Sequence, residues 1–217
     1  YQRPGAPTMK EKGWQGADLI FDLDADHLRG APESYSGMLE QVKRETGKLL
    51  SFLLSDFGFA ESRISVVFSG GRGYHIHVRD PRIYCFGGDE RREILDYLSG
   101  RGLAMDWFIN EAPFEGQDGA RRLRAPSEGA PGWGGRINRS ILSFVEGLRI
   151  LDEPQAVAVL SRVKGIGPKR ASSFYRSLQG EGVIEEIRKG NLDLFRGSAT
   201  IWKLLLKEFL GSEGVAM

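Results

Sequence analysis

Hydrophobic and polar residues alternate along one stretch near the start of the chain. Residues 18–27 read Asp-Leu-Ile-Phe-Asp-Leu-Asp-Ala-Asp-His, and this period of two predicts a strand. One face of that strand is apolar and carries Leu19, Phe21 and Leu23. The opposite face carries Ile20, Asp22 and Asp24. We therefore expect a strand that packs on a core with one side and presents two carboxylates on the other.

A second stretch, residues 66–78, reads Val-Val-Phe-Ser-Gly-Gly-Arg-Gly-Tyr-His-Ile-His-Val. The apolar run, the glycine-rich segment and the alternating run that follows predict two strands joined by a turn. On the second of these strands one face carries His75 and His77. The other face carries Tyr74, Ile76 and Val78.

In the sequence, one helix is expected before this strand pair and one after it. In residues 38–54 an apolar stripe recurs with helical spacing and Ser36 is the expected N-cap. The stripe consists of Leu39, Val42, Leu49, Leu50, Leu53 and Leu54. The pattern of residues 89–98 predicts a second helix that begins at Asp89 and directs three apolar side chains toward the core. These are Ile94, Leu95 and Leu98.

The second half of the chain has a different pattern. Residues 110–136 are rich in glycine, proline and arginine and predict a long loop. A helical portion is expected from residue 137, with two more helices in residues 184–210. The expected fold class is α/β in the α+β sense, with an α/β domain in residues 1–136 and a helical subdomain in residues 137–217.

Composition narrows the class of protein. The 217 residues are 41% hydrophobic and 27% charged, which suits a globular domain with a core. A net charge of +1 means that any nucleic-acid-binding surface must be local. The single cysteine, Cys85, excludes a disulfide framework and a cysteine zinc site. No apolar stretch reaches the ~18 residues of a membrane span, and we expect a protein of the reducing cytosol.

Asp22 and Asp24 are candidate metal ligands. Two positions of strand rise place them roughly 6.5 Å apart on one face, close enough to share divalent cations. Ligand sets made only of oxygen favour Mg²⁺ or Mn²⁺ over zinc. An edge strand that runs into an acidic turn explains the same pattern, and the spacing alone leaves both readings open.

The glycine turn predicts a phosphate-binding concavity. Glycines allow close approach of the backbone, amides donate, and arginine adds a forked cation. The candidate nucleotide-binding residues are Ser69, Gly70, Gly71, Arg72 and His75. The segment is not a P-loop, since no Gly-Lys-Ser/Thr follows it and no helix is expected there.

These two motifs, in this order, resemble the catalytic small subunit of the archaeal and eukaryotic DNA primase. The resemblance extends through Gly13-Trp14, Asp56-Phe57-Gly58-Phe59 and Glu90-Arg91-Arg92-Glu93-Ile94, and it is strongest over residues 1–107. It implies a mixed-sheet primase core with a helical insertion. It also implies nucleotidyl transfer with Mg²⁺ or Mn²⁺ on Asp22 and Asp24, and a triphosphate held by Ser69, Arg72 and His75.

The resemblance further implies a large primase subunit as partner, a single-stranded DNA template and nucleoside triphosphates as substrates. The expected location is the cytoplasm, near the nucleoid, or the nucleus in a eukaryote. The family's third metal carboxylate and its Arg-Leu-Pro-Gly-Ser-Leu-His-Gly stretch have no match before Met217. Asp80 and Asp106 stand in no matching motif, and Asp26 is a neighbour of the site. We therefore expect weak metal binding and little activity from this polypeptide alone.

Two basic segments are candidates for nucleic-acid contact. Arg121, Arg122 and Arg124 lie in the expected loop, where a merely solvated charge run is an equal alternative. Residues 163–171 read Val-Lys-Gly-Ile-Gly-Pro-Lys-Arg-Ala and are similar to a helix-hairpin-helix element. There Lys169 and Arg170 could meet a DNA phosphate at a helix N-terminus. A plain helix junction is the alternative.

Three other functions fit parts of the pattern. A repair or plasmid polymerase of the same superfamily shares both motifs. A phosphatase of the haloacid-dehalogenase type also begins with Asp-x-Asp after a strand, although Asp26 and the lack of a clear later acidic pair argue against it. A nucleic-acid-binding fragment with an inert site is the third alternative.

Overall fold

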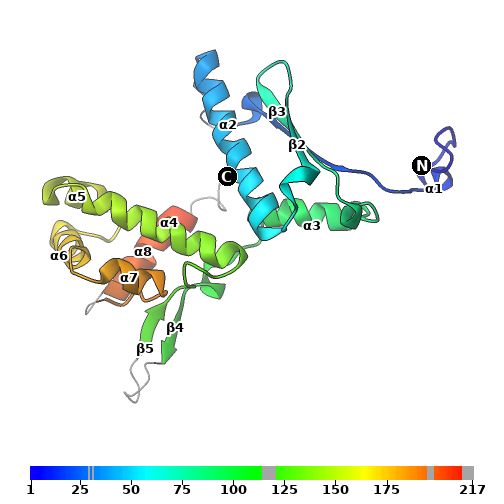
Figure 1. Ribbon diagram of the computed structural model, residues 1–217. Coiled ribbons are helices and arrows are strands. Elements are labelled where there is room, and N and C mark those ends of the chain that lie inside the picture. The colour runs from blue at the N-terminus through cyan, green and yellow to red at the C-terminus, as the bar shows by residue number, and fades with distance from the viewer. Residues whose placement is uncertain (29, 31, 114–120, 195–197, 212–217) are drawn as a thin grey trace. The chain divides into compact units, whose positions relative to one another are not determined.

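The computed structural model describes residues 1–28, 30, 32–113, 121–194 and 198–211, and Figure 1 shows their helices and strands. The chain forms two compact units, Tyr1–Arg101 and a second unit that begins at Gly102. This division differs from the boundary expected after residue 136. The reason is that the strand pair after Gly102 packs with the helices that follow, since Leu123 is buried in the same apolar cluster as those helices.

The first unit contains a three-stranded antiparallel sheet in the order β1-β3-β2. The strands are β1 (Leu19–Asp24), β2 (Ile64–Phe68) and β3 (Gly73–Val78). The strands predicted from alternation are therefore confirmed, and so is the α+β class. All strand pairs among the described residues are antiparallel, so the parallel pairing that a mixed sheet requires is not seen there.

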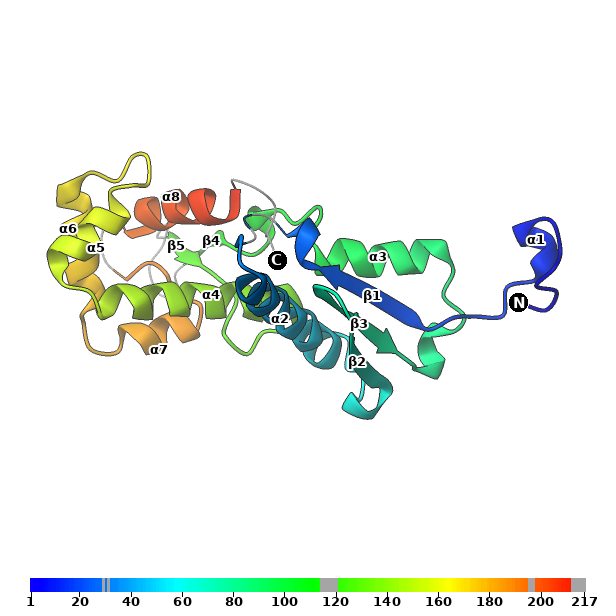
Figure 2. The same ribbon diagram turned by 90° about the horizontal axis from the view of Figure 1, so that it is seen from above.

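The two faces of this sheet differ in exposure. Leu19, Ile76 and Val78 are buried on one face, while Ile20 and Val67 on the other are 60% and 49% exposed. Helix α2 (Tyr35–Ser51) packs against β1 and β3 on the buried face, as Figure 2 shows. On β2, at the edge of the same face, Val66 and Phe68 are 44% and 45% exposed. The open face is the one that carries the two aspartates.

Helix α2 begins earlier than expected. Its N-cap is Ser34, whose hydroxyl accepts a hydrogen bond from the Gly37 amide, and not Ser36. The helix continues into a π-helical turn, Phe52–Asp56. Of the predicted stripe, Leu54 lies in this turn and is exposed, while the adjacent Leu53 is buried.

The described part of the first unit also contains the α-helices α1 (Met9–Lys12) and α3 (Gly88–Leu98). In α3, Ile94 and Leu98 are buried as predicted, but Leu95 is exposed. The helix is joined to the π-helical turn after α2 by Tyr97, whose hydroxyl donates to Asp56 at 2.9 Å.

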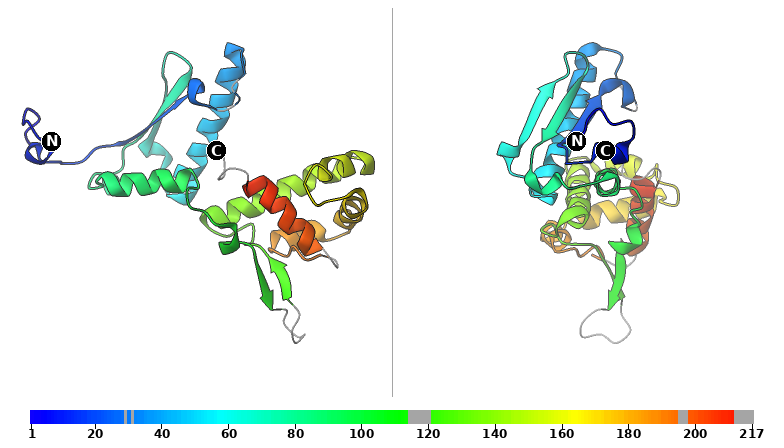
Figure 3. Two further views of the ribbon diagram at one scale, coloured as in Figure 1. Left: turned by 180° about the vertical axis from the view of Figure 1, so that it is seen from behind. Right: turned by 90° about the vertical axis from the view of Figure 1, so that its right-hand side faces the viewer.

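The second unit contains an antiparallel strand pair, β4 (Asn110–Pro113) and β5 (Arg121–Arg124), drawn in green in Figure 3. The prediction of a long loop over residues 110–136 is therefore wrong for these segments. Charged and proline residues hide the alternation in such short strands. The first helix of the unit, α4 (Gly132–Arg149), also begins before residue 137.

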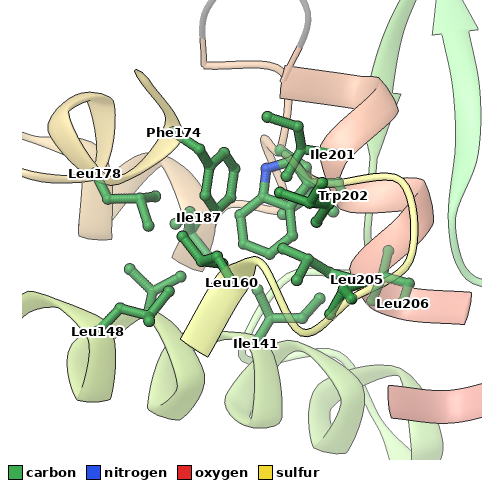
Figure 4. Packing of buried hydrophobic residues seen from close by; sticks show 14 of the residues in the cluster. Ile141, Leu148, Leu160, Phe174, Leu178, Ile187, Ile201, Trp202, Leu205 and Leu206 are labelled. Carbon is green, nitrogen blue, oxygen red and sulfur yellow. The ribbon is translucent and has the colours of Figure 1, made fainter. Parts of the chain in front are cut away.

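The remaining helices are α5 (Glu153–Leu160), α6 (Pro168–Leu178), α7 (Val183–Arg188) and α8 (Ser198–Gly211). Their apolar faces meet around Trp202 and Phe174, whose rings pack edge to face with centroids 5.1 Å apart (Figure 4). None of the described helices has the length and apolar content that crossing a membrane requires.

Candidate functional site

Asp22 and His75 lie opposite each other on β1 and β3. Directly opposed residues of an antiparallel pair point to the same face, so the register brings the two side chains together. The Asp22 Oδ1 atom is 3.3 Å from His75 Nε2, and the side chains are 69% and 40% exposed. The pair therefore faces solvent on the open side of the sheet.

Asp24 ends β1 and caps the short 3-10 turn that follows, Ala25–His27. Its Oδ1 atom accepts a hydrogen bond from the Asp26 amide at 3.1 Å. This contact fixes the carboxylate at the end of the strand and leaves its second oxygen without a hydrogen bond among the described residues. Asp22 and Asp24 point to the same face because they are two positions apart on one strand.

The donor set of this face suits a hard divalent cation. Asp22 and Asp24 offer carboxylate oxygens, the ligand type that Mg²⁺ and Mn²⁺ prefer. In polymerase sites Mg²⁺ is held by one or two carboxylates together with substrate phosphates and water. Among the described residues no group of three or more histidine, cysteine, aspartate or glutamate side chains is placed to hold a metal ion. The two aspartates thus fit part of a metal site.

The glycine turn between β2 and β3 is closed by a hydrogen bond from the Ser69 amide to the Gly73 carbonyl at 3.0 Å. Gly70 has a φ of 82°, a left-handed conformation that favours glycine. The Gly71 amide donates to the Ser69 hydroxyl at 3.4 Å, a long contact that another acceptor can replace. Ser69, Gly70 and Gly71 are all exposed.

The turn and the aspartates lie at the same end of the sheet, because Asp24 pairs with Gly73 across β1 and β3. A Cβ atom at Gly73 would lie 2.2 Å from the Leu23 carbonyl oxygen. Only glycine fits this close approach of the two backbones. Gly73 was not among the sequence-predicted site residues, and its role becomes visible only with the strand register.

Arg72 is held by the residues that follow β1. Its Nη2 atom donates to Asp26 Oδ2 at 2.5 Å, and its carbonyl accepts from the Ala25 amide at 3.1 Å. On the other side of the turn the Tyr35 hydroxyl donates to the Gly71 carbonyl at 2.9 Å. The sequence did not predict that Asp26 and Tyr35 contact the glycine turn, because no local pattern shows which distant segment a side chain meets.

Asp80 and Asp106 have other surroundings. Asp80 is buried, and hydrogen bonds from the Arg82 guanidinium and amide lower its pKa from 3.8 to about 2. This carboxylate is hydrogen-bonded to Arg82, so we assign it a structural role. Asp106 lies in the second unit, on the 3-10 turn Met105–Trp107.

The three arginines of the expected loop lie on β5. Arg124 is half-buried and its guanidinium donates to the Asn191 side chain, so it joins β5 to the segment after α7. Arg122 is exposed, whereas the side chain of Arg121 lies outside the described residues. Arg124 is therefore at least partly a structural residue.

Residues 161–167 connect α5 to α6, and residues 168–171 form the first turn of α6. A helix-hairpin-helix element and a plain helix junction both fit this arrangement. Val163 and Ile166 are buried, and Gly165 has a φ of 98°. Lys169 and Arg170 lie exposed in the first turn of α6 and form no ion pair within the part of the chain that the structure describes. The hairpin thus offers two unpaired cations to solvent.

The profile of the family described as DNA primase small subunit matches residues 21–125. The DNA primase small subunit PriS of Methanothrix thermoacetophila is 55% identical over 213 residues, which are 95% of this chain and 54% of the relative. That of Methanococcoides burtonii is 46% identical over 196 residues, or 89% of this chain and 50% of the relative. That of Halobacterium salinarum is 39% identical over 219 residues, 98% of this chain and 54% of the relative.

The chain spans about half the length of the curated relatives that it matches. The matched region of the family profile contains both the Asp22–Asp24 strand and the glycine turn. Identity at this level over nearly the whole chain confirms the resemblance that those motifs carry: the chain belongs to the DNA primase small subunit family.

Proposed function

We propose that this chain carries the nucleotide-handling part of a DNA primase, which makes short RNA or DNA primers on single-stranded DNA by two-metal nucleotidyl transfer. One observation supports the proposal most directly. Asp22, Asp24 and His75 lie on one open face of the sheet, and the glycine turn lies at the end of the sheet where Asp24 pairs with Gly73. This arrangement can hold a cation and a triphosphate next to each other.

The proposed reaction joins two nucleotides. A 3′-hydroxyl oxygen attacks the α-phosphorus of an incoming nucleoside triphosphate and forms a phosphoester bond. The bond from that phosphorus to the bridging oxygen breaks, pyrophosphate leaves with the electron pair, and the hydroxyl proton passes to solvent. Asp22 and Asp24 would hold Mg²⁺ or Mn²⁺, and these ions, when bound, lower the pKa of the hydroxyl and balance the phosphate charge.

The other residues of the site would bind the triphosphate. Arg72 offers a planar fork of donors that matches phosphate oxygens. The Ser69 hydroxyl and the amides of Gly70 and Gly71 add neutral donors at close range. His75 would donate to a phosphate oxygen from its place beside Asp22. Each of these groups is exposed or half-buried, so a ligand can reach it.

Primer synthesis by the full-length natural protein tests this proposal. The protein is incubated with a polypyrimidine single-stranded DNA, labelled ATP and Mn²⁺, and the products are separated by length. Asp22→Ala and Asp24→Ala should each abolish short products, whereas Asp89→Asn, a change at an exposed aspartate of α3, should not. Full activity in both site variants would reject the assignment.

The same assay separates the alternatives. Extension of an existing primer without initiation would favour a repair-type polymerase of the superfamily. Phosphate release from small phosphoesters without template would favour the haloacid-dehalogenase reading, against which the family membership already argues. DNA binding without primer synthesis by the full-length protein would favour the alternative of a nucleic-acid-binding protein with an inert site.

We also propose that the α5–α6 hairpin contacts the DNA backbone through Lys169 and Arg170. Support comes from their exposure in the first turn of α6 and from the lack of an ion pair to either side chain within the described residues. Lys169→Glu with Arg170→Glu should weaken binding to single-stranded DNA and flatten its dependence on salt. Lys43→Glu with Arg92→Glu applies the same charge change to the first unit and should have less effect. Equal effects of the two pairs would reject the contact.

The proposed partner is a large primase subunit, because the relatives are named small subunits. The proposed location is the cytoplasm, where the template DNA of an archaeal cell lies. Co-purification of the full-length protein with the large subunit of the same organism checks the partner directly.

A further inference from the structure

Asp26 and Arg72 form an ion pair between two turns that lie far apart in the sequence. The Arg72 Nη2 atom is 2.5 Å from Asp26 Oδ2, and the two side chains are 45% and 47% exposed. Asp26 stands in the 3-10 turn after β1, and Arg72 ends the glycine turn before β3. The pair thus connects the segment next to the candidate metal ligands with the segment proposed to bind phosphate.

The backbones of the two turns are joined independently of this pair. The Ala25 amide donates to the Arg72 carbonyl at 3.1 Å, and Gly73 packs directly against the Leu23 carbonyl. The main chain of the glycine turn is therefore fixed without the Asp26 carboxylate. What the carboxylate controls is the direction of the Arg72 side chain, which has many rotamers when it is free.

The pair leaves most of the guanidinium available. Arginine has five N–H donors, and the ion pair uses Nη2. Nε and Nη1 make no hydrogen bond to the described residues. A carboxylate on one edge of the fork can hold the other edge in place for a phosphate oxygen. Ordering the side chain beforehand also reduces the entropy that is lost when a ligand binds.

We propose that Asp26 is a positioning residue, which holds the Arg72 guanidinium ready for the triphosphate of the incoming nucleotide. This inference rests on the proposed function, since it assumes that Arg72 binds phosphate. It assigns Asp26 a role that differs from that of Asp22 and Asp24: Asp26 acts through Arg72 and not through a metal ion.

Asp26→Asn in the full-length protein tests the role. The substitution keeps the backbone amide that donates to Asp24, and it removes the charge that holds Arg72. We expect KM for the nucleoside triphosphate to rise about 2- to 10-fold, the loss typical when one flexible side chain is no longer ordered beforehand. The kcat should stay within about twofold, because no group that touches the reacting atoms changes. Asp26→Glu, which restores the charge, should recover part of the affinity.

Asp18→Asn is the matched control. Asp18 forms an exposed ion pair with Arg79 at 3.2 Å, at the other end of β1 and away from the glycine turn. The control removes a comparable pair from the same sheet and should leave KM unchanged. Thermal unfolding should give similar Tm values for both variants, since exposed ion pairs contribute little to stability.

A double-mutant cycle decides between positioning and a general effect of charge. Arg72→Ala should raise KM by itself, and adding Asp26→Asn in that background should change nothing further. Equal effects of Asp26→Asn with and without Arg72 would overturn the inference. So would a loss confined to kcat, because that would place Asp26 in the chemical step.

Direct binding separates this inference from the proposed function. ATP with Mn²⁺ is titrated into the wild-type protein and into Asp26→Asn by calorimetry. No binding to the wild-type protein would count against the proposed function itself. Equal binding to both proteins would leave the proposed function standing and reject the positioning role of Asp26.

Discussion

The Asp22 carboxylate and the His75 imidazole face each other across two neighbouring strands, with Oδ1 3.3 Å from Nε2. The register of β1 and β3 alone produces this contact, because Asp22 and His75 are paired residues of the antiparallel ladder. A candidate metal ligand therefore lies next to a residue that is a candidate hydrogen-bond donor to phosphate. A cation on the aspartate and a phosphate on the histidine would be neighbours.

Replacement of His75 should reduce catalysis. We expect His75→Ala to lower kcat/KM for primer synthesis about 100-fold, in the range seen when one donor to developing charge is removed. His77→Ala is the control, since His77 lies on the same face with its ring centroid 6.5 Å from that of His75. Steady-state kinetics on the full-length protein measure both. Equal losses of kcat/KM in the two variants would contradict a specific role of His75 and indicate a general effect of changes on the open face of the sheet.

Gly73→Ala should destabilise the sheet. The added Cβ would lie 2.2 Å from the Leu23 carbonyl oxygen, so the strands must separate. We expect a loss of about 2–3 kcal/mol in the free energy of unfolding, as for other overpacked sites. Gly71→Ala meets only the Ser69 hydroxyl at 3.9 Å and should change stability little. Urea unfolding measures both variants, and similar midpoints would contradict the steric argument.

Trp202→Ala should destabilise the second unit. Trp202 is buried against Phe174, and the substitution leaves a large cavity in the helical core. The expected loss in the free energy of unfolding is about 3–5 kcal/mol. Ile150→Ala removes a side chain that is 86% exposed and should cost less than about 0.5 kcal/mol. A small effect of Trp202→Ala in the same unfolding experiment would show that the core can collapse around the gap.

Asp80 should make stability depend on pH in acid. Hydrogen bonds from Arg82 lower the pKa of Asp80 from 3.8 to about 2 in the folded protein. The unfolded chain then binds the proton first, so the contribution of Asp80 to stability is complete above pH 3.8 and is lost as the pH falls towards 2. Asp80→Asn should remove that part of the pH dependence of unfolding. NMR titration of the Asp80 carboxyl near pH 3.8 in the folded protein would contradict the prediction.

The site could be predicted in part from the sequence. Asp22 and Asp24 share a face because a strand has a period of two, and His75 follows by the same rule on its own strand. Which strand lies opposite which, and in which register, depends on contacts between distant segments. For this reason the ion pair of Asp26 with Arg72 and the requirement for glycine at position 73 were visible only in the structure.

The role of the arginines also needed the tertiary structure. A run of three arginines in a glycine-rich segment indicates an exposed loop, yet Arg124 is half-buried on β5 and donates to Asn191. The strand pair that contains it is short and carries charges on both faces, so its sequence has no clear alternation. Packing of Leu123 into the helical core determines its conformation.

The sequence by itself determined the α+β class, the sheet strands of the first unit, the largely helical character of the second and the membership of the primase family, because periodicity and motif order are local properties of the chain. Only the tertiary structure decided where the two units divide and which side chains meet at the open face. Those outcomes depend on strand register and on burial between segments far apart in the sequence, for which free energy is gained only after the chain has folded.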